Sequence, residues 1–336
     1  MNTEPQTRFS DGFNKRGVKS VLLSFLHWFD ADAAKVDEAH PYRINWLRCM
    51  PFIIVHAACL LTFWLGWSPV ALIVCLAFFW IRMFAITAIY HRYFSHRSYK
   101  MNRTWQFFFA CIGAMSAQRG PLWWAAHHRN HHKHSDKKDD LHSPVRHSFW
   151  WSHMGWFLSN KGYETDYSVV PDLAKYKELV FLNRFDSLMP ILAALGMYGL
   201  GELLAATAPA LGTNGLQMVV WGFCVSTVFL FHATFTINSL GHVWGSRRFQ
   251  TKDHSRNNAF LALLTLGEGW HNNHHRFAVS ARQGFYWWEL DISYLILKLL
   301  KTVGVVRDLN PVPQRILEEG RGAKTAENLS APSTKH

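Results

Sequence analysis

Three histidine clusters carry the residue types and spacings best suited to chemistry in this sequence. The first is HRYFSH, the second is HRNHH and the third is HNNHH, and the last two each place three histidines at positions i, i+3 and i+4. On a helix these positions share one face, so three imidazoles can converge on one or two metal ions. A lone histidine is usually an ordinary polar residue, but two separate triads of this kind predict a metal site.

The segment NSLGH adds Asn238 and His242, which are four residues apart and share a helix face. Imidazole suits zinc, copper, iron and nickel alike, so ligand type does not choose the metal. The candidate imidazoles are too many for one tetrahedral zinc and suit two metals of higher coordination number. The expected chemistry of two adjacent redox metals in a membrane is oxygen activation, which favours iron as the metal. The predicted imidazole ligands are His91, His96, His128, His131, His132, His242, His271, His274 and His275.

Carboxylates are nearly absent from the clusters, which separates this pattern from the glutamate-rich soluble di-iron bundles. Asp136, Asp139 and Asp140 follow the second cluster. They could accept hydrogen bonds from ligand imidazoles, but we expect them to be solvated charges of a loop.

Long, nearly uncharged segments lie on either side of the first two clusters. Between Trp46 and Ile89 the only ionised side chains are Arg48 and Arg82, and from residue 187 to 245 the only one is Glu202. Segments of ~20 such residues are long enough to cross a bilayer as helices. We therefore predict four crossings, at about residues 46–67, 69–90, 187–208 and 216–240.

The predicted fold is all-α: an integral membrane protein with four transmembrane helices and a cytoplasmic helical cap that holds the histidines. Lys and Arg concentrate before the first crossing, between the second and third, and after the fourth, so these regions are expected in the cytoplasm. We expect an N-terminal segment 1–45 with an interfacial helix, a membrane domain 46–311, and a polar, disordered tail 312–336. The charge asymmetry disfavours a soluble helical bundle.

The remaining composition narrows the classes of function. Basic loops that orient the chain and face anionic lipid explain the net charge of +12, and no nucleic-acid-binding fold is visible. The five cysteines lie in apolar surroundings without a C-x-x-C pair, which indicates core packing. No haem, flavin or iron–sulfur motif is visible, so electrons for redox chemistry would come from a separate carrier.

Taken together, HRYFSH, HHRNHH, NSLGH and GEGWHNNHH resemble the membrane-bound fatty acid desaturases, of the Δ9 acyl-CoA (stearoyl-CoA) type in the prokaryotic branch. The resemblance implies two Fe ions held by the nine histidines, with Asn238 acting through a water and O2 as co-substrate. It implies a long acyl chain in a tunnel between helices and cap. The reaction would remove two hydrogens, using two electrons, and leave a cis double bond. A multi-pass protein of the bacterial inner membrane, with its active site facing the cytoplasm, is expected.

Two departures from the animal acyl-CoA enzymes leave the acyl carrier open. Those enzymes have an Arg-Asp pair where this chain has Ala126 and His127, and a second basic pair is reduced here to Lys161. Phosphate recognition usually uses Arg or Lys. Arg129 and Lys161 are therefore the predicted substrate-binding residues for an acyl-CoA, and an acyl-lipid is the alternative substrate. The expected electron donor is ferredoxin, rubredoxin or a cytochrome b5-like carrier with its reductase.

Two other functions stay open. A related membrane di-iron hydroxylase would use similar histidine clusters, although NSLGH and GEGW favour the desaturase. A metal transporter or sensor belongs to a different class. Transporters usually bind their cargo near the middle of the bilayer, whereas these clusters are expected at its cytoplasmic edge.

Overall fold

The computed structural model describes residues 22–23, 25–33 and 39–330, with side chains up to residue 322. The described chain is mostly helical, as predicted. Its single sheet is an antiparallel pair, β1 (Lys100–Met101) with β2 (Val306–Arg307). The N-terminal segment 1–45, in which we expected an interfacial helix, falls only partly within the described residues.

Three helices of the described chain are long and apolar enough to cross a membrane, and they correspond to the predicted second, third and fourth crossings. They are Pro69–Ser95, formed by α4 (Pro69–Phe84) and the π-helix η2 (Ala85–Ser95); α11 (Leu188–Thr207); and Gly215–Val243, formed by α12 (Gly215–Met218), the π-helix η6 (Val219–Val225) and α13 (Ser226–Val243).

The predicted first crossing is a shorter apolar helix, Met50–Leu65, made of α2 (Met50–Ala58), η1 (Cys59–Leu61) and α3 (Thr62–Leu65). At 1.5 Å per residue it measures about 24 Å, less than the hydrocarbon core of about 30 Å. Gly66, with φ of 65°, ends it in a conformation that glycine tolerates. The structure thus supports the second, third and fourth predicted crossings by length and composition, and the first crossing stays a prediction.

Local sequence explains where the long helices begin. The Ser68 side chain accepts a hydrogen bond from the backbone N–H of Ala71, and Pro69 occupies the first turn of α4, where its missing N–H costs nothing. Asn214 caps α12 in the same way, by accepting from Gln217 N–H.

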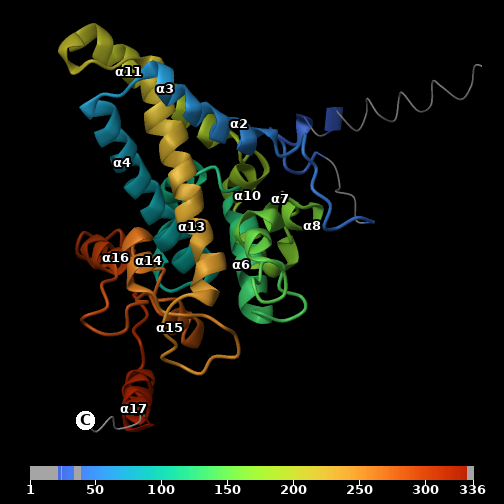
Figure 1. Cartoon of the computed structure of the whole chain (residues 1–336), viewed down its shortest axis with the longest axis vertical. Helices are drawn as coiled ribbons and strands as arrows, with labels where there is room; N and C mark the ends of the chain where they lie inside the picture. The colour runs from blue at the N-terminus through green and yellow to red at the C-terminus, as the bar shows by residue number, and fades with distance from the viewer. Residues whose placement is uncertain (1–21, 24, 34–38, 331–336) are drawn as a thin grey trace, which may run out of the picture.

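Arg82 fixes α4 against its neighbours inside the bundle. Its side chain is fully buried and donates hydrogen bonds to Thr227 Oγ1 at 2.7 Å, to Ser226 Oγ at 2.6 Å and to the Met115 carbonyl at 3.1 Å. α4 and α13 run side by side in Figure 1. The guanidinium therefore sets both the depth and the rotation of α4 relative to α13.

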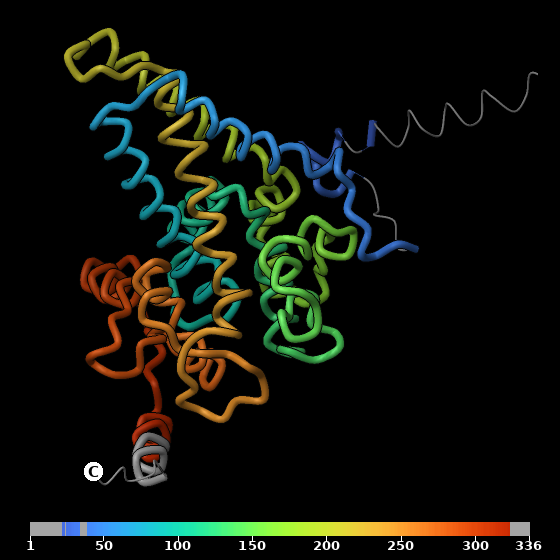
Figure 2. The backbone as a smooth tube through the Cα atoms, viewed as in Figure 1, coloured from blue at the N-terminus to red at the C-terminus, as the bar shows by residue number. Residues whose placement is uncertain are grey.

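Shorter helices cluster at one end of the long ones, around α6 and α15 (Figure 1). Within the described part of the tail 312–336, which we expected to be disordered, residues Gln314–Ser330 form the helix α17, and Ile316 is buried beside Phe285 and Tyr286. The rest of that prediction, for residues 331–336, lies outside the described residues. The helix α17 extends away from the long helices (Figure 2). The remaining elements are α5 (Arg103–Ala114), α6 (Pro121–His134), η3 (Trp151–Gly155), α7 (Trp156–Leu158), α8 (Asn160–Tyr163), η4 (Tyr167–Val169), α9 (Pro171–Ala174), α10 (Lys177–Arg184), η5 (Pro209–Leu211), α14 (Ala259–Leu264), α15 (His271–Arg276), α16 (Ile292–Thr302) and α17 (Gln314–Ser330).

Candidate metal centre

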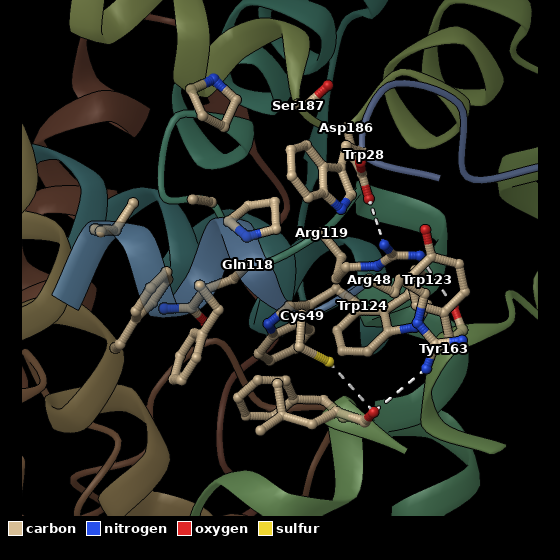
Figure 3. Close-up of a pocket in the computed structure, with 18 of the residues that line it drawn as sticks. Trp28, Arg48, Cys49, Gln118, Arg119, Trp123, Trp124, Tyr163, Asp186 and Ser187 are labelled. Atoms are coloured by element: carbon tan, nitrogen blue, oxygen red, sulfur yellow. Dashed lines mark hydrogen bonds and ion pairs between the residues drawn. The ribbon is translucent and has the colours of Figure 1, made fainter. Parts of the chain in front are cut away.

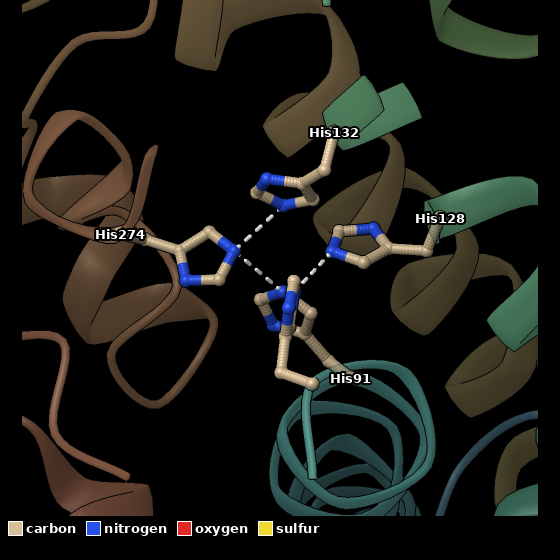
Figure 4. Close-up of side chains that lie close together, drawn as sticks. His91, His128, His132 and His274 are labelled. Atoms are coloured by element: carbon tan, nitrogen blue, oxygen red, sulfur yellow. Dashed lines mark hydrogen bonds between the residues drawn. The ribbon is translucent and has the colours of Figure 1, made fainter. Parts of the chain in front are cut away.

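The structure brings all nine predicted imidazoles together, in two adjacent groups. In each group, one ring nitrogen per histidine lies within 4.8 Å of every other. Figure 4 shows the first group, in which rings from η2, α6 and α15 point toward one another. The first group is His91, His96, His128, His132 and His274, and the second is His131, His242, His271 and His275.

Helix geometry explains how each cluster contributes to the groups. His91 and His96 are five residues apart, and the π-helical bond from His96 N–H to the His91 carbonyl brings their rings edge to face, with centroids 4.9 Å apart. An ordinary α-helix pairs residues three or four apart, so the π-helix lets the HRYFSH spacing work. The i, i+3, i+4 triads on α6 and α15 each contribute to both groups, which places the groups side by side.

The Nε2 atoms form the interior of the first group. His91 Nε2 lies 3.0 Å from His274 Nε2, which lies 2.9 Å from His132 Nε2, and His96 Nε2 lies 2.8 Å from His128 Nε2. Imidazole lone pairs that converge in this way suit a shared cation.

A carboxylate contacts the Nδ1 atom of four of these rings. Asp140 accepts from His131 at 3.0 Å, Asp136 from His242 at 3.0 Å and Asp253 from His275 at 2.9 Å, while Glu268 contacts His91. Such partners fix the tautomer of a metal-ligating histidine, so that Nε2 carries the free lone pair. The expectation that Asp136 and Asp140 are solvated was wrong because both are buried, whereas Asp139 is exposed as expected.

Burial and hydrogen bonding set the protonation of the centre. Burial, followed by neighbouring imidazoles, lowers the pKa of His96, His128 and His274 well below the ordinary histidine value. Burial alone would raise the pKa of Asp136, but hydrogen bonds from His242 and Ser143 outweigh it and lower that pKa. Burial therefore favours the neutral form of these three imidazoles, and the hydrogen bonds favour the ionised form of the Asp136 carboxylate.

Two observations indicate that this donor set fits a pair of divalent metal ions. His275 Nε2 is buried without a hydrogen-bond partner, although its Nδ1 is held by Asp253. The four carboxylates carry the negative charge that two divalent cations would balance, because the nearby Arg92 charge is offset by a further carboxylate, Asp291. A buried charge needs such compensation.

A cavity of about 470 Å³ leads to the centre, and its wall is mainly apolar and aromatic. A smaller space of about 40 Å³ lies among His91, His128, His131 and His271. Both are lined by His128 and Asn238, so the cavity reaches the metal centre where we predicted Asn238 to act.

Comparison with known proteins identifies the family of the chain. The fatty acid desaturase family model matches residues 62–298. The chain belongs to the fatty acid desaturase family. It is 39% identical over 248 residues to the acyl-CoA C20 Δ5-desaturase of Anemone leveillei, covering 72% of this chain and 74% of that protein. It is 33% identical over 306 residues to the sn-1 stearoyl-lipid 9-desaturase of Synechocystis, covering 90% and 91%. It is 33% identical over 276 residues to the sn-2 palmitoyl-lipid 9-desaturase of Nostoc, covering 81% and 92%.

The two predicted substrate-binding residues of this desaturase lie outside the lining of the cavity. Arg129 donates to the carbonyls of Phe94, Ser95 and Val169 and pairs with Asp172 at 2.7 Å. Lys161 is exposed, with its ammonium 5.9 Å from the centre of the Tyr42 ring. Through these contacts Arg129 connects the end of η2 to η4 and α9. A role for either residue in substrate binding stays a prediction.

Sequence reasoning missed the charged residues that do line the cavity. Arg48, Arg119 and Asp186 come from three separate parts of the chain and meet there (Figure 3). Arg119 pairs with Asp186 at 3.2 Å, and the Nε atoms of both arginines are buried without partners. No spacing in the sequence links these residues, although the position of Arg48 within an apolar stretch was a usable signal.

Proposed function

We propose that this desaturase introduces a cis double bond, at the Δ9 position, into a saturated long-chain acyl group. The observation that carries the proposal is the junction of the apolar cavity with two groups of histidines at His128 and Asn238. The balanced reaction is –CH2–CH2– + O2 + 2 H⁺ + 2 e⁻ → –CH=CH– + 2 H2O. O2 and the two electrons are required because four electrons reduce O2 to water, and the substrate supplies only two.

Two iron ions held by the nine histidines, with Asn238 contributing through a water, would supply the oxidant needed to break an unactivated C–H bond. The residues of the chain do the positioning. The four carboxylates hold four of the nine ligand imidazoles in one tautomer, and the apolar wall excludes water and limits side reactions. The cavity fixes which two methylenes lie beside His128 and Asn238, and that placement selects the bond to be oxidised.

The cavity also supports an anionic head group on the substrate. Arg48 and Arg119 face it with only Asp186 as an ionised partner in the lining. A phosphate would meet the excess positive charge. We propose acyl-CoA as the substrate and an acyl-lipid as the alternative; relatives of both kinds exist, since those named above act on acyl-CoA or on lipid-linked chains.

The proposed setting is a bacterial inner membrane with the metal centre facing the cytoplasm. The long apolar helices support membrane insertion, and the basic segments beside the centre support this orientation. Electrons would come from a separate carrier, namely ferredoxin, rubredoxin or a cytochrome b5-like protein with its reductase.

A fatty-acid profile by gas chromatography and mass spectrometry tests the function. The host should lack its own desaturase and express the wild type, His274→Ala, or the control His134→Ala, which removes a histidine of α6 outside both groups. We expect new mono-unsaturated chains with the wild type and the control alone. Hydroxylated chains in place of alkenes would make the protein a hydroxylase, and metal uptake without oxidised lipid would make it a transporter.

Feeding purified protein in detergent with matched acyl-CoA and acyl-phospholipid substrates separates the two carriers. Conversion of the acyl-CoA supports our first choice. Conversion of the phospholipid alone would overturn it and leave the desaturase assignment intact.

A further inference from the structure

One exposed side chain is connected by hydrogen bonds to the buried metal centre. His254 has 51% of its side chain exposed, and its Nδ1 lies 3.3 Å from Asp136 Oδ2. The same oxygen accepts from His242 Nδ1 at 3.0 Å, and the His242 side chain is almost completely buried. A chain of hydrogen bonds through His254, Asp136 and His242 therefore leads from solvent to the centre. The Nε2 atom of His242 faces the second histidine group, 3.0 Å from His271 Nε2.

The other three carboxylates of the centre lack such a connection among the described residues. Asp140 accepts from backbone N–H groups in its own loop, Asp253 from the hydroxyls of Thr251 and Ser255, and Glu268 from Arg92 and Gln283. The Asp136 carboxylate alone is bonded to an exposed imidazole. Its backbone is held at φ of 57°, a left-handed conformation that costs energy outside glycine.

The surface around His254 is basic. It is formed by the loop after α6 and the loop between α13 and α14, which meet where His254 N–H donates to Asp136 Oδ2 at 2.7 Å. We call this surface the basic rim. In the described part of these loops Asp139 is the one exposed carboxylate, and the exposed cations are Lys137, Lys138, Arg146 and Lys252; exposed Lys133 in the last turn of α6 adds to the same surface.

We propose that the basic rim is the docking site of an acidic one-electron carrier protein, and that electrons enter the metal centre through His254, Asp136 and His242. This inference rests on the proposed function, because only a reaction that reduces O2 needs the two electrons. Each carrier molecule is oxidised by one electron, so two must dock and leave in every turnover. A steered, short-lived complex held by rim charges meets that requirement, since such charges raise association rates more than they lengthen lifetimes.

Carrier binding tests the docking half of the proposal. The probes are the soluble domain of cytochrome b5 and a plant-type ferredoxin, with association followed by surface plasmon resonance at low and high salt. Reversing two rim charges, Lys137→Glu with Lys252→Glu, should slow association by about tenfold or more at low salt and flatten the salt dependence. Lys177→Glu is the control, because this exposed lysine begins α10, which packs at the opposite end of α6.

Unchanged association in the double variant would overturn the docking site. So would binding of the wild-type rim to vesicles of anionic phospholipid but to neither carrier, because the cations would then serve membrane contact.

Reduction of the iron-loaded centre tests the path. His254→Leu removes the exposed ring but keeps the backbone N–H that donates to Asp136, so the loop and the His242 tautomer should persist. We expect unchanged iron content and carrier affinity, and at least about tenfold slower reduction by pre-reduced carrier, measured without acyl substrate by stopped-flow spectroscopy. His134→Leu is the control. Equal reduction rates in His254→Leu and the wild type would refute the path.

This readout separates the two proposals. A wild type that is reduced rapidly by the carrier yet forms no alkene would refute desaturation and keep the entry site. If the wild type forms alkene, but substitutions in the basic rim and at His254 change neither carrier association nor the reduction rate, the function stands and the entry site is refuted.

Discussion

Asp253→Asn tests how the carboxylates control the metal ligands. Asp253 Oδ2 accepts from His275 Nδ1 at 2.9 Å, while Oδ1 accepts from the backbone N–H of Ser255 and from Thr251 Oγ1, both at 3.0 Å. An asparagine has the same shape but one oxygen fewer. If its amide nitrogen faces His275, two donors meet. Rotating the amide does not help, because its nitrogen then faces the Ser255 N–H.

The least costly response is for His275 to change tautomer and place its proton on Nε2, the buried atom that lacks a partner. A protonated Nε2 cannot bind a metal. Loss of such a partner typically lowers metal affinity by about 10- to 100-fold, which corresponds to about 1.4 to 2.7 kcal/mol. We therefore expect the second histidine group to lose its metal first.

The assay is a chelator titration of iron-loaded protein in detergent, with bound iron counted by mass spectrometry and product measured on the same samples. Asp139→Asn is the matched control, since that carboxylate is exposed. We expect one iron of the pair to be released at lower chelator concentration in Asp253→Asn only. Wild-type retention of both ions in that variant would refute the view that this carboxylate sets the tautomer.

Three further outcomes follow from the structure. Gly113→Ala should destabilise the protein by about 1–3 kcal/mol, because a Cβ there would lie 2.2 Å from the buried Tyr90 ring. Gly199→Ala should leave the stability unchanged, because a Cβ there meets nothing within 4 Å. Thermal unfolding in detergent compares the two variants. Arg119→Gln should raise KM for the acyl substrate with a smaller effect on kcat, since the residue lines the cavity away from the histidines. Steady-state kinetics measure this, with Arg103→Gln at an exposed site as the control. An unchanged KM in Arg119→Gln would contradict the prediction. Burial lowers the pKa of His128, His132 and His271, so the unfolded chain takes up protons below pH 6.5 that the folded chain does not, and metal-free protein should lose stability as the pH falls below that value; a melting temperature that rises on acidification would contradict the assignment.

The histidine groups could be predicted because their geometry is local. Helical spacing alone places His128, His131 and His132 on one face of α6, and the same spacing recurs in α15. The carboxylates could not be predicted in this way. Asp136 and His242 are 106 residues apart, and the loop that carries Asp136 resembles any polar loop until its fold is known.

The membrane helices likewise have features that local sequence predicts and features that it does not. Hydropathy located three of them, yet it set the end of the second crossing at residue 90, where the charged and polar run begins. The helix continues to Ser95 because its last turns are buried in protein, so tertiary packing decides that boundary.

The hydrogen bonds from Arg82 to Thr227 and Ser226 fix the rotation of α4 and η2 about their common axis. Arg82 fixes the rotation of the helix Pro69–Ser95 at one point. Nine residues later on the same uninterrupted helix, His91 must face the metal centre. Inserting or deleting one residue between them would turn His91 by about 100° and remove it from its group. This segment should therefore tolerate changes of side chain better than changes of length. An alignment of natural desaturases, or a scan of single-residue deletions, should show no insertions or deletions between Arg82 and His91.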